Sequence, residues 1–135
     1  MQMNAVSWLY LVFALALANW LVAVIALRSF LSRTPVIVST LDLENYAVLV
    51  RRHMFQALLQ AVLLAAGLLL GIYVLVSGRA GLLLVLALNG VILVAGMLGK
   101  PLEERARSLR VLDPLLEERY REIGISWVKK PFPDF

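Results

Sequence analysis

Three long stretches without a charged residue limit what this chain can fold into. They cover residues 5–27, 54–76 and 80–99, and each is rich in Leu, Val and Ala. A helix needs about 20 apolar residues to cross the hydrocarbon core of a bilayer. Each stretch is long enough by itself, so the sequence predicts three transmembrane helices.

The overall composition supports this interpretation. Hydrophobic residues make up 61% of the 135 residues and charged residues 16%, whereas soluble domains have about 45–50% and about 25%. A soluble domain of this size must cover most of its surface with polar groups. The composition therefore disfavours a soluble enzyme and a disordered chain. The sequence also has no cysteine, which excludes disulfides and thiolate metal sites.

The connections between the stretches differ in length. Only residues 77–79 separate the second stretch from the third, so these two spans should form a tight helical hairpin. A loop of residues 28–53 joins the first two spans, and residues 100–135 form a tail. We therefore expect an all-α membrane protein with a three-span domain over residues 1–99 and an amphipathic helical tail over residues 100–135.

The positive charges gather on one predicted side of the membrane. Three spans place the N-terminus and the hairpin on one side, and the loop and the tail on the other. Of the 13 Lys and Arg residues, four lie in the loop, eight in the tail and one in the hairpin. The positive-inside rule then places the N-terminus outside and the C-terminus in the cytoplasm. A bacterial inner membrane or a thylakoid-type membrane would suit this orientation.

Local signals divide the loop between the first two spans. Residues 34–38 are β-branched and apolar, and we expect an extended or interfacial segment that has no strand partner. Ser39 and Asp42 have the spacing of a capping box. The sequence therefore predicts a helix that starts near Thr40 and runs directly into the second span.

The tail contains signals for two short helices. Pro101 predicts a break after the third span. Apolar residues at helical spacing then predict an amphipathic helix over residues 102–112. Asp113 and Pro114 are typical of a helix start, and Gly124 is expected to end this second helix. The acidic residues of the tail, Glu103 among them, alternate with Arg and are interpreted as a solvated, salt-bridged face.

The last residues of the chain combine aromatic and basic side chains. This composition suits a membrane interface or a groove on a partner protein. The tail holds seven acidic residues beside its eight basic ones, so nucleic acid is not an expected partner. The residues expected to dock are Trp127, Lys129, Lys130, Phe132 and Phe135.

Polar and small residues share one stripe on each span. On the second span Gln56, Gln60, Gly67 and Gly71 fall on one narrow face, and the two glycines form a GxxxG pattern that permits close helix approach. Asn89 shares a face with Gly96 on the third span. The residues expected in helix–helix packing are Asn19, Gln56, Gln60, Gly67, Gly71, Asn89 and Gly96.

The amides have two interpretations. Asn19, Gln60 and Asn89 lie at similar depths, about 9–15 Å from the inner boundary at 1.5 Å per residue. Amides at one depth can hold helices together through hydrogen bonds, which is the interpretation we favour. The alternative is that they orient a quinone, a pigment or another ligand.

His53 is the sole histidine and lies at the inner boundary of the second span. Its simplest role is that of an interfacial residue near lipid phosphates. Ligation of a haem or chlorophyll is the alternative. The sequence shows no nucleophile–base pair, no phosphate loop and no metal cluster, so we predict neither catalysis nor a bound metal.

The predicted function is therefore that of a non-catalytic accessory subunit within a larger membrane complex, which we expect to be energy-transducing. Its partners would be the lipid bilayer and other membrane subunits. The spans contain no Asp, Glu, Lys or Arg, which counts against a self-sufficient transporter. Two alternatives stay open. One is a homo-oligomeric channel or small transporter, and the other is a cofactor- or quinone-binding protein that uses the amide stripe and His53.

Overall fold

The computed structural model describes residues 4–79 and 81–135. Residues 1–3 and Ala80, the first residue of the third predicted span, lie outside the described residues. The first three helices are long and apolar enough to cross a membrane, which confirms the all-α architecture with three candidate spans. The elements in chain order are α1 (Ala5–Arg33), β1 (Val36–Ile37), α2 (Thr40–Val76), α3 (Leu82–Arg107), β2 (Arg110–Val111) and α4 (Pro114–Lys129).

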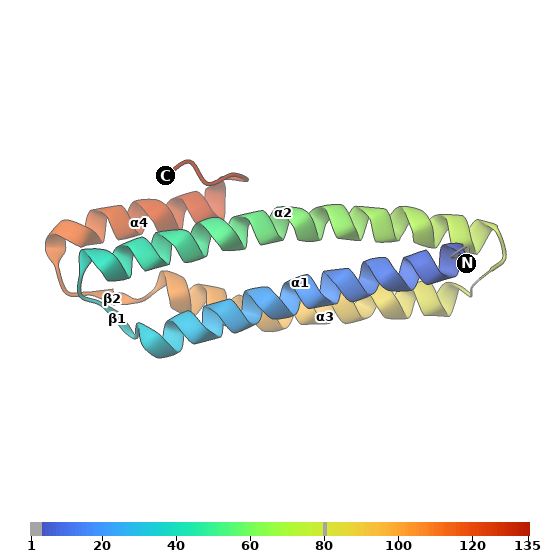
Figure 1. Cartoon of the computed structure of the whole chain (residues 1–135), viewed down its shortest axis with the longest axis horizontal. Helices are drawn as coiled ribbons and strands as arrows, with labels where there is room; N and C mark the ends of the chain where they lie inside the picture. Colours follow the sequence, from blue (N-terminus) through green and yellow to red (C-terminus); the bar gives the residue numbers. More distant parts are fainter. Residues whose placement is uncertain (1–3, 80) are drawn as a thin grey trace.

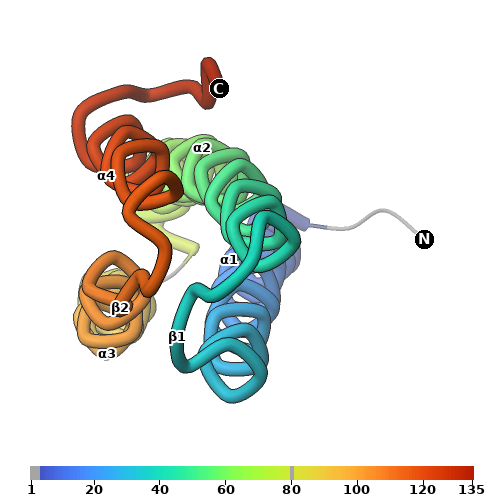
Figure 2. Tube along the Cα trace, turned by 90° about the vertical axis from the view of Figure 1, so that its left-hand side faces the viewer, coloured from blue at the N-terminus to red at the C-terminus, as the bar shows by residue number. Residues whose placement is uncertain are grey.

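The three long helices lie side by side along the long axis of the molecule, and α1 packs against both α2 and α3 (Figures 1 and 2). The shorter α4 runs beside the N-terminal part of α2, and both strands lie at that same end. We call α1–α3 within the spans the membrane bundle. Residues 28–53 and 100–135 together form the extramembrane module, because they lie beyond the predicted spans. The domain boundary expected at residue 99 thus falls within α3.

The long helix α2 begins where its cap predicts. The Ser39 hydroxyl accepts a hydrogen bond from the Asp42 amide at 3.2 Å, and the Asp42 carboxylate accepts one from the Ser39 amide at 3.1 Å. The capping box is therefore confirmed. Backbone amides of Val38 and Ser39 that donate to this carboxylate hold the pKa of Asp42 below its usual value. Much of the expected loop over residues 28–53 is consequently helical.

The turn between α2 and α3 explains the tight hairpin. Gly78 has a φ of 63°, a left-handed conformation that glycine adopts without steric cost. Its amide donates to the Leu75 carbonyl, and the Arg79 amide donates to the Val74 carbonyl, both at 3.0 Å. These two bonds form a Schellman motif that ends α2.

The strands correct one expectation. Residues 34–38 were expected to have no strand partner, but Val36 and Ile37 pair in parallel with Arg110 and Val111. The expectation is wrong because α1 and α3 extend past the spans at the same end. The segments that follow these two helices therefore lie next to each other and can share backbone hydrogen bonds.

Pro101 does not end α3, contrary to the prediction. It lies inside the helix, which continues to Arg107, so residues 102–112 do not form a separate helix. Proline removes one backbone hydrogen bond from a helix interior. The continued helix buries Ala106 completely in a cluster with Leu27 and Leu31 of α1, and this packing offsets that cost.

Gly124 does not end α4 either. The helix begins at the predicted cap, where the Asp113 carboxylate accepts from the Leu115 amide at 2.9 Å, and continues to Lys129. A Cβ built on Gly124 would meet the Tyr46 hydroxyl at 3.7 Å. The glycine thus lies on the face of α4 that packs against α2, and the burial of Ile123 on that face favours continuation of the helix.

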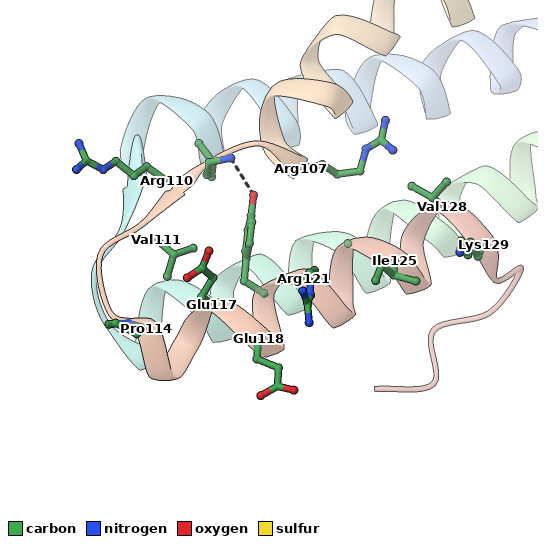
Figure 3. A pocket seen from close by; sticks show the side chains of 13 residues that line it. Arg107, Arg110, Val111, Pro114, Glu117, Glu118, Arg121, Ile125, Val128 and Lys129 are labelled. Carbon is green, nitrogen blue, oxygen red and sulfur yellow. Dashed lines mark hydrogen bonds between the residues drawn. The ribbon is translucent and has the colours of Figure 1, made fainter.

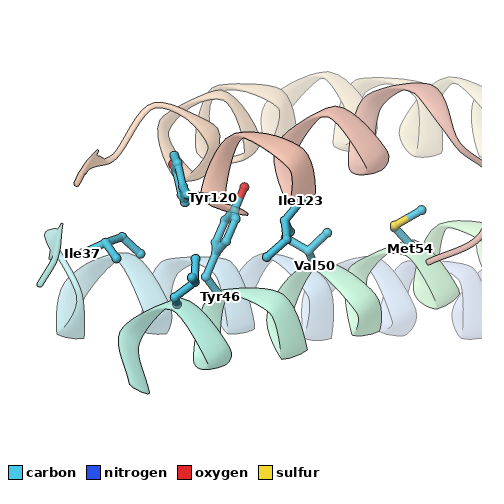
Figure 4. Close-up of a cluster of buried hydrophobic side chains, with 7 residues drawn as sticks. Ile37, Tyr46, Val50, Met54, Tyr120 and Ile123 are labelled. Carbon is cyan, nitrogen blue, oxygen red and sulfur yellow. The ribbon is translucent and has the colours of Figure 1, made fainter. Parts of the chain in front are cut away.

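The extramembrane module has its own core (Figure 4). Tyr46 is completely buried and its ring centroid lies 4.7 Å from that of Tyr120, 6.0 Å from Phe30 and 6.4 Å from Trp127. Aromatic pairs at such separations are stabilising. The buried members of this core are Ile37, Leu43, Tyr46, Val50, Met54, Tyr120 and Ile123.

The two neighbouring tyrosines differ in their hydrogen bonds. The Tyr120 hydroxyl donates to the Ala106 carbonyl at 2.6 Å and accepts from the Leu109 amide at 2.9 Å. The buried Tyr46 hydroxyl has no hydrogen-bond partner among the described residues. Burial raises the pKa of both tyrosines above the usual value, and it does so most for Tyr46.

Candidate functional site

A cavity of about 180 Å³ lies among α1, α2 and α3, where the membrane bundle meets the extramembrane module. Its walls combine small residues, apolar residues and an unusual number of polar groups for this depth. The polar side chains that line it are Asn19, Trp20, His53, Gln56, Gln60 and Glu103.

The amides of α1 and α2 meet in this cavity. Asn19 Nδ2 donates to Gln60 Oε1 at 2.9 Å and to the Gln56 carbonyl at 3.0 Å. These bonds join the two helices. Within the described residues, 4–79 and 81–135, no further hydrogen bond involves Asn19 Oδ1, Gln60 Nε2 or the side-chain amide of Gln56.

The third amide does not join this group. Asn89 Nδ2 donates to the Val85 carbonyl, one turn earlier on α3, at 2.8 Å. The structure thus brings Asn19, Gln56 and Gln60 together and leaves Asn89 bonded within its own helix. Similar depth alone was therefore not enough to predict a three-way contact.

The two glycines of the GxxxG pattern pack inside the bundle. A Cβ on Gly67 would meet the Phe13 ring at 3.3 Å, and one on Gly71 would meet Val85 Cγ1 at 3.0 Å. Both glycines are buried, so they serve the approach of α1 and α3 to α2. Gly96 is exposed, a Cβ there would meet nothing within 4 Å, and it lines the cavity.

His53 and Glu103 form the end of the cavity nearest the extramembrane module. His53 Nε2 lies 2.9 Å from Glu103 Oε1, and the two side chains are 13% and 35% exposed. The edge of the Trp127 ring lies against His53, with 5.3 Å between centroids. Both residues also line a second hollow of about 320 Å³ beside Trp127. The pair thus forms a wall shared by two hollows.

Sequence reasoning missed Glu103 because it placed this residue on a solvated tail face. That placement followed from the expected break at Pro101. In the continuous α3, Glu103 lies four residues after Gly99 and therefore on the same helix face. A prediction that continued the third span as a helix through Pro101 would have placed Glu103 close to His53.

The geometry does not favour His53 as a haem or chlorophyll ligand. Nε2 is engaged by Glu103, and Nδ1 is buried without a hydrogen-bond partner in the described chain. A macrocycle would have to displace the surrounding side chains to reach Nδ1. Within residues 4–79 and 81–135, no group of three or more His, Cys, Asp or Glu residues could hold a metal ion.

The aromatic residues near the end of the chain are largely engaged within the molecule. Trp127 is half-buried on α4, and Arg107 lies over its ring at 5.8 Å. Phe135 lies under Arg51 at 5.6 Å, and its main-chain oxygen accepts a hydrogen bond from the same guanidinium. Phe132, in contrast, is 60% exposed.

The two lysines of this segment differ in the same way. Lys130 forms a salt bridge with Asp134, and this bond holds the pKa of Asp134 below its usual value. Both lysines are exposed. Lys129, Lys130 and Phe132 are thus the expected docking residues whose side chains are exposed, and of these Lys130 is paired with Asp134.

A broad groove of about 1030 Å³ lies between α4 and the segment that runs from the end of α3 into β2 (Figure 3). Its lining mixes cationic, acidic and apolar side chains, including Arg107, Arg121 and Lys129 with Glu117, Ile125 and Val128. Neither a family model nor a curated protein nor a solved structure matches this chain.

Proposed function

We propose that this chain is a non-catalytic accessory subunit of a larger integral-membrane complex and that its extramembrane module contacts a partner subunit. The supporting observation is a group of exposed apolar side chains where the strands meet the starts of α2 and α4. Leu115 is 87% exposed, Leu41 63%, Val38 56% and Leu112 54%. We call these four residues the apolar tip.

The apolar tip lies too far from the bilayer for lipid to cover it. The module extends along the axis of the spans, because α4 runs beside α2 and does not cross it (Figure 1). Between Thr40 and His53, α2 rises about 20 Å at 1.5 Å per residue. Several large apolar side chains exposed at one end of the molecule, outside the predicted membrane, favour a protein contact, so the proposed partner is a protein.

The proposed orientation follows from the charges. With 12 of 13 Lys and Arg residues in residues 28–53 and 100–135, the positive-inside rule supports a cytoplasmic module and an outer N-terminus. The membrane would be a bacterial inner membrane or a thylakoid-type membrane, and the host would be an energy-transducing complex. The apolar outer faces of the spans would contact lipid and partner helices.

The orientation can be tested directly because the chain has no cysteine. Ser77 in the hairpin and Ser108 in the module are both exposed. In intact cells, a membrane-impermeant maleimide should label Ser77→Cys and spare Ser108→Cys, and inverted vesicles should show the reverse. Labelling of Ser108→Cys in intact cells would contradict the proposed orientation.

The subunit proposal is tested by site-specific crosslinking. A photoreactive amino acid at Leu115 should crosslink a membrane-complex subunit in cells, whereas the same amino acid at exposed Arg121, on a different face of α4, should not. Leu115→Glu should also release that subunit during purification in mild detergent, and Arg121→Glu should retain it. Recovery of the wild-type protein only as a lone monomer, without crosslinks, would contradict the proposal.

A further inference from the structure

The cavity among α1, α2 and α3 holds hydrogen-bonding groups that the chain itself does not use. Gln60 Nε2, Gln56 Nε2 and Trp20 Nε1 can donate, and Asn19 Oδ1 and Gln56 Oε1 can accept. Within the described residues, no protein group bonds to them. The bilayer core supplies no water to unpaired polar groups, and each one left unpaired there costs free energy. These groups therefore favour a polar occupant of the cavity.

The chemistry of the walls restricts that occupant. Most of the unused groups are donors, so the occupant must carry acceptor oxygens. The carboxylate of Glu103 is engaged by His53, and none of the other lining residues is charged. No Lys or Arg lines the cavity, so an anionic head would find no countercharge there, and His53 already occupies Oε1 of the lining carboxylate. The cavity suits a neutral head whose oxygens are carbonyls.

The size and the opening of the cavity restrict the occupant further. A volume of about 180 Å³ is small compared with pockets that enclose a whole drug-sized ligand, roughly 300–1,000 Å³, so it suits a single ring. Ala57 of α2 and Gly96 of α3 line the cavity and are both exposed. They lie about one helical turn inside the predicted membrane boundary, where an apolar tail attached to the ring could pass into the lipid.

We propose that this cavity binds the head ring of a quinone-class amphiphile, with its carbonyl oxygens accepting from Gln60, Gln56 and Trp20 and its tail leaving between Ala57 and Gly96. This inference goes beyond the subunit role, since it assigns a ligand to the membrane bundle and does not depend on a partner at the apolar tip. The His53–Glu103 pair would close the cavity on the side of the extramembrane module.

Two glycines of α3 provide a matched test. A Cβ on Gly96 or on Gly90 would meet nothing within 4 Å, so both positions should accept a leucine. Gly96 lines the cavity and Gly90 does not. Gly96→Leu should therefore fill the entrance of the cavity, while Gly90→Leu adds the same bulk elsewhere on the helix.

The experiment uses a background protein that carries Trp8→Phe and Trp127→Phe, so that Trp20 is its one tryptophan. Decylubiquinone is titrated into this protein in phosphatidylcholine nanodiscs, and the fluorescence of Trp20 is followed. Saturable quenching is expected for the background protein and for Gly90→Leu. Gln60→Leu should weaken binding about tenfold, which corresponds to the loss of one hydrogen bond. Gly96→Leu should weaken it at least as much, because its side chain fills the entrance. Circular dichroism checks that each variant is folded.

Three results would overturn the proposal. The first is quenching that rises linearly with quinone in the background protein, as for partition into lipid. The second is a quenching curve for folded Gly96→Leu that equals the curve for folded Gly90→Leu. The third is equally effective competition by methyl decanoate, which carries an ester carbonyl but no ring and would assign the cavity to lipid esters.

Discussion

The membrane bundle and the extramembrane module are stabilised by different kinds of contact. In the bundle, α1 and α3 approach α2 at Gly67 and Gly71, and the amide of Asn19 bonds to α2. In the module, the Tyr46 and Tyr120 rings pack against each other within a cluster of buried apolar side chains. The two regions meet near His53.

This difference follows from the surroundings of each region. Lipid is as apolar as leucine, so burying a large side chain between transmembrane helices gains little, and close packing and hydrogen bonds dominate. Outside the membrane, burial of apolar area from water is worth about 25 cal/mol per Å². Large rings therefore stabilise the module, whereas small residues stabilise the bundle.

The largest expected effect comes from removal of the central ring of the module. Tyr46→Ala should destabilise the module by about 3–5 kcal/mol, because it opens a cavity where the ring is completely buried. Denaturant unfolding in detergent, followed by Trp127 fluorescence, would measure the loss. Helical signal from the bundle should persist at denaturant concentrations that unfold the module.

Val48 provides the control for this variant, because it lies on the same part of α2 and is 59% exposed. Val48→Ala should change the free energy of unfolding by less than about 0.5 kcal/mol. If Tyr46→Ala unfolded the bundle and the module together, the two regions would form one cooperative unit. That result would contradict their separate stabilisation.

A smaller but still large effect is expected from the close approach in the bundle. A Cβ at Gly71 would lie 3.0 Å from Val85 Cγ1, so Gly71→Ala should displace the Val85 side chain at a cost of about 1–3 kcal/mol. Gly90→Ala meets nothing within 4 Å and should be neutral or stabilising, because alanine favours helix more than glycine does. Thermal unfolding in detergent would compare the two, and equal midpoints would refute the close-packing account.

Local signals in the sequence were enough to predict much of the fold. The caps at Ser39 and Asp113 and the three spans depend on residues that are neighbours along the chain, so their patterns can be read directly. The pairing of Val36 with Arg110 could not be read in this way, because it depends on where two helices end in space. At Pro101 a local rule failed because burial of Ala106 outweighs one missing hydrogen bond.

The candidate site was predicted in part. The shared helical face of Gln56 and Gln60 and the similar depth of Asn19 and Gln60 indicated that these amides face neighbouring helices, and the structure brings the three together. Glu103 was missed because its position depends on the continuity of α3 through Pro101. The contacts of Trp127 with His53 and Tyr46 were missed because α4 was expected to end at Gly124.

A third prediction separates the two neighbouring tyrosines of the module. Tyr120→Phe removes a hydroxyl that bonds to Ala106 and Leu109, and leaves those backbone groups without their partner, so it should cost about 1–3 kcal/mol. Tyr46→Phe removes a buried hydroxyl that has no partner among the described residues, so it should be neutral or stabilising. Denaturant unfolding should therefore show a loss of stability for Tyr120→Phe and none for Tyr46→Phe, and an equal loss for both would show that the Tyr46 hydroxyl is bonded.

The smallest expected effect concerns the amides of the bundle. Asn19→Leu removes the bonds to Gln60 and to the Gln56 carbonyl, yet hydrogen bonds between transmembrane helices average only about 0.6 kcal/mol. A double-mutant cycle with Gln60→Leu isolates the side-chain pair from changes in packing. We expect a coupling energy near that average from unfolding in detergent, which would leave close packing at Gly67 and Gly71 as the main source of bundle stability. A coupling energy above about 2 kcal/mol would exceed the range measured for such bonds. The bundle, like Tyr120 in the module, would then depend on its buried hydrogen bonds. Close packing of small residues would no longer distinguish the bundle from the module.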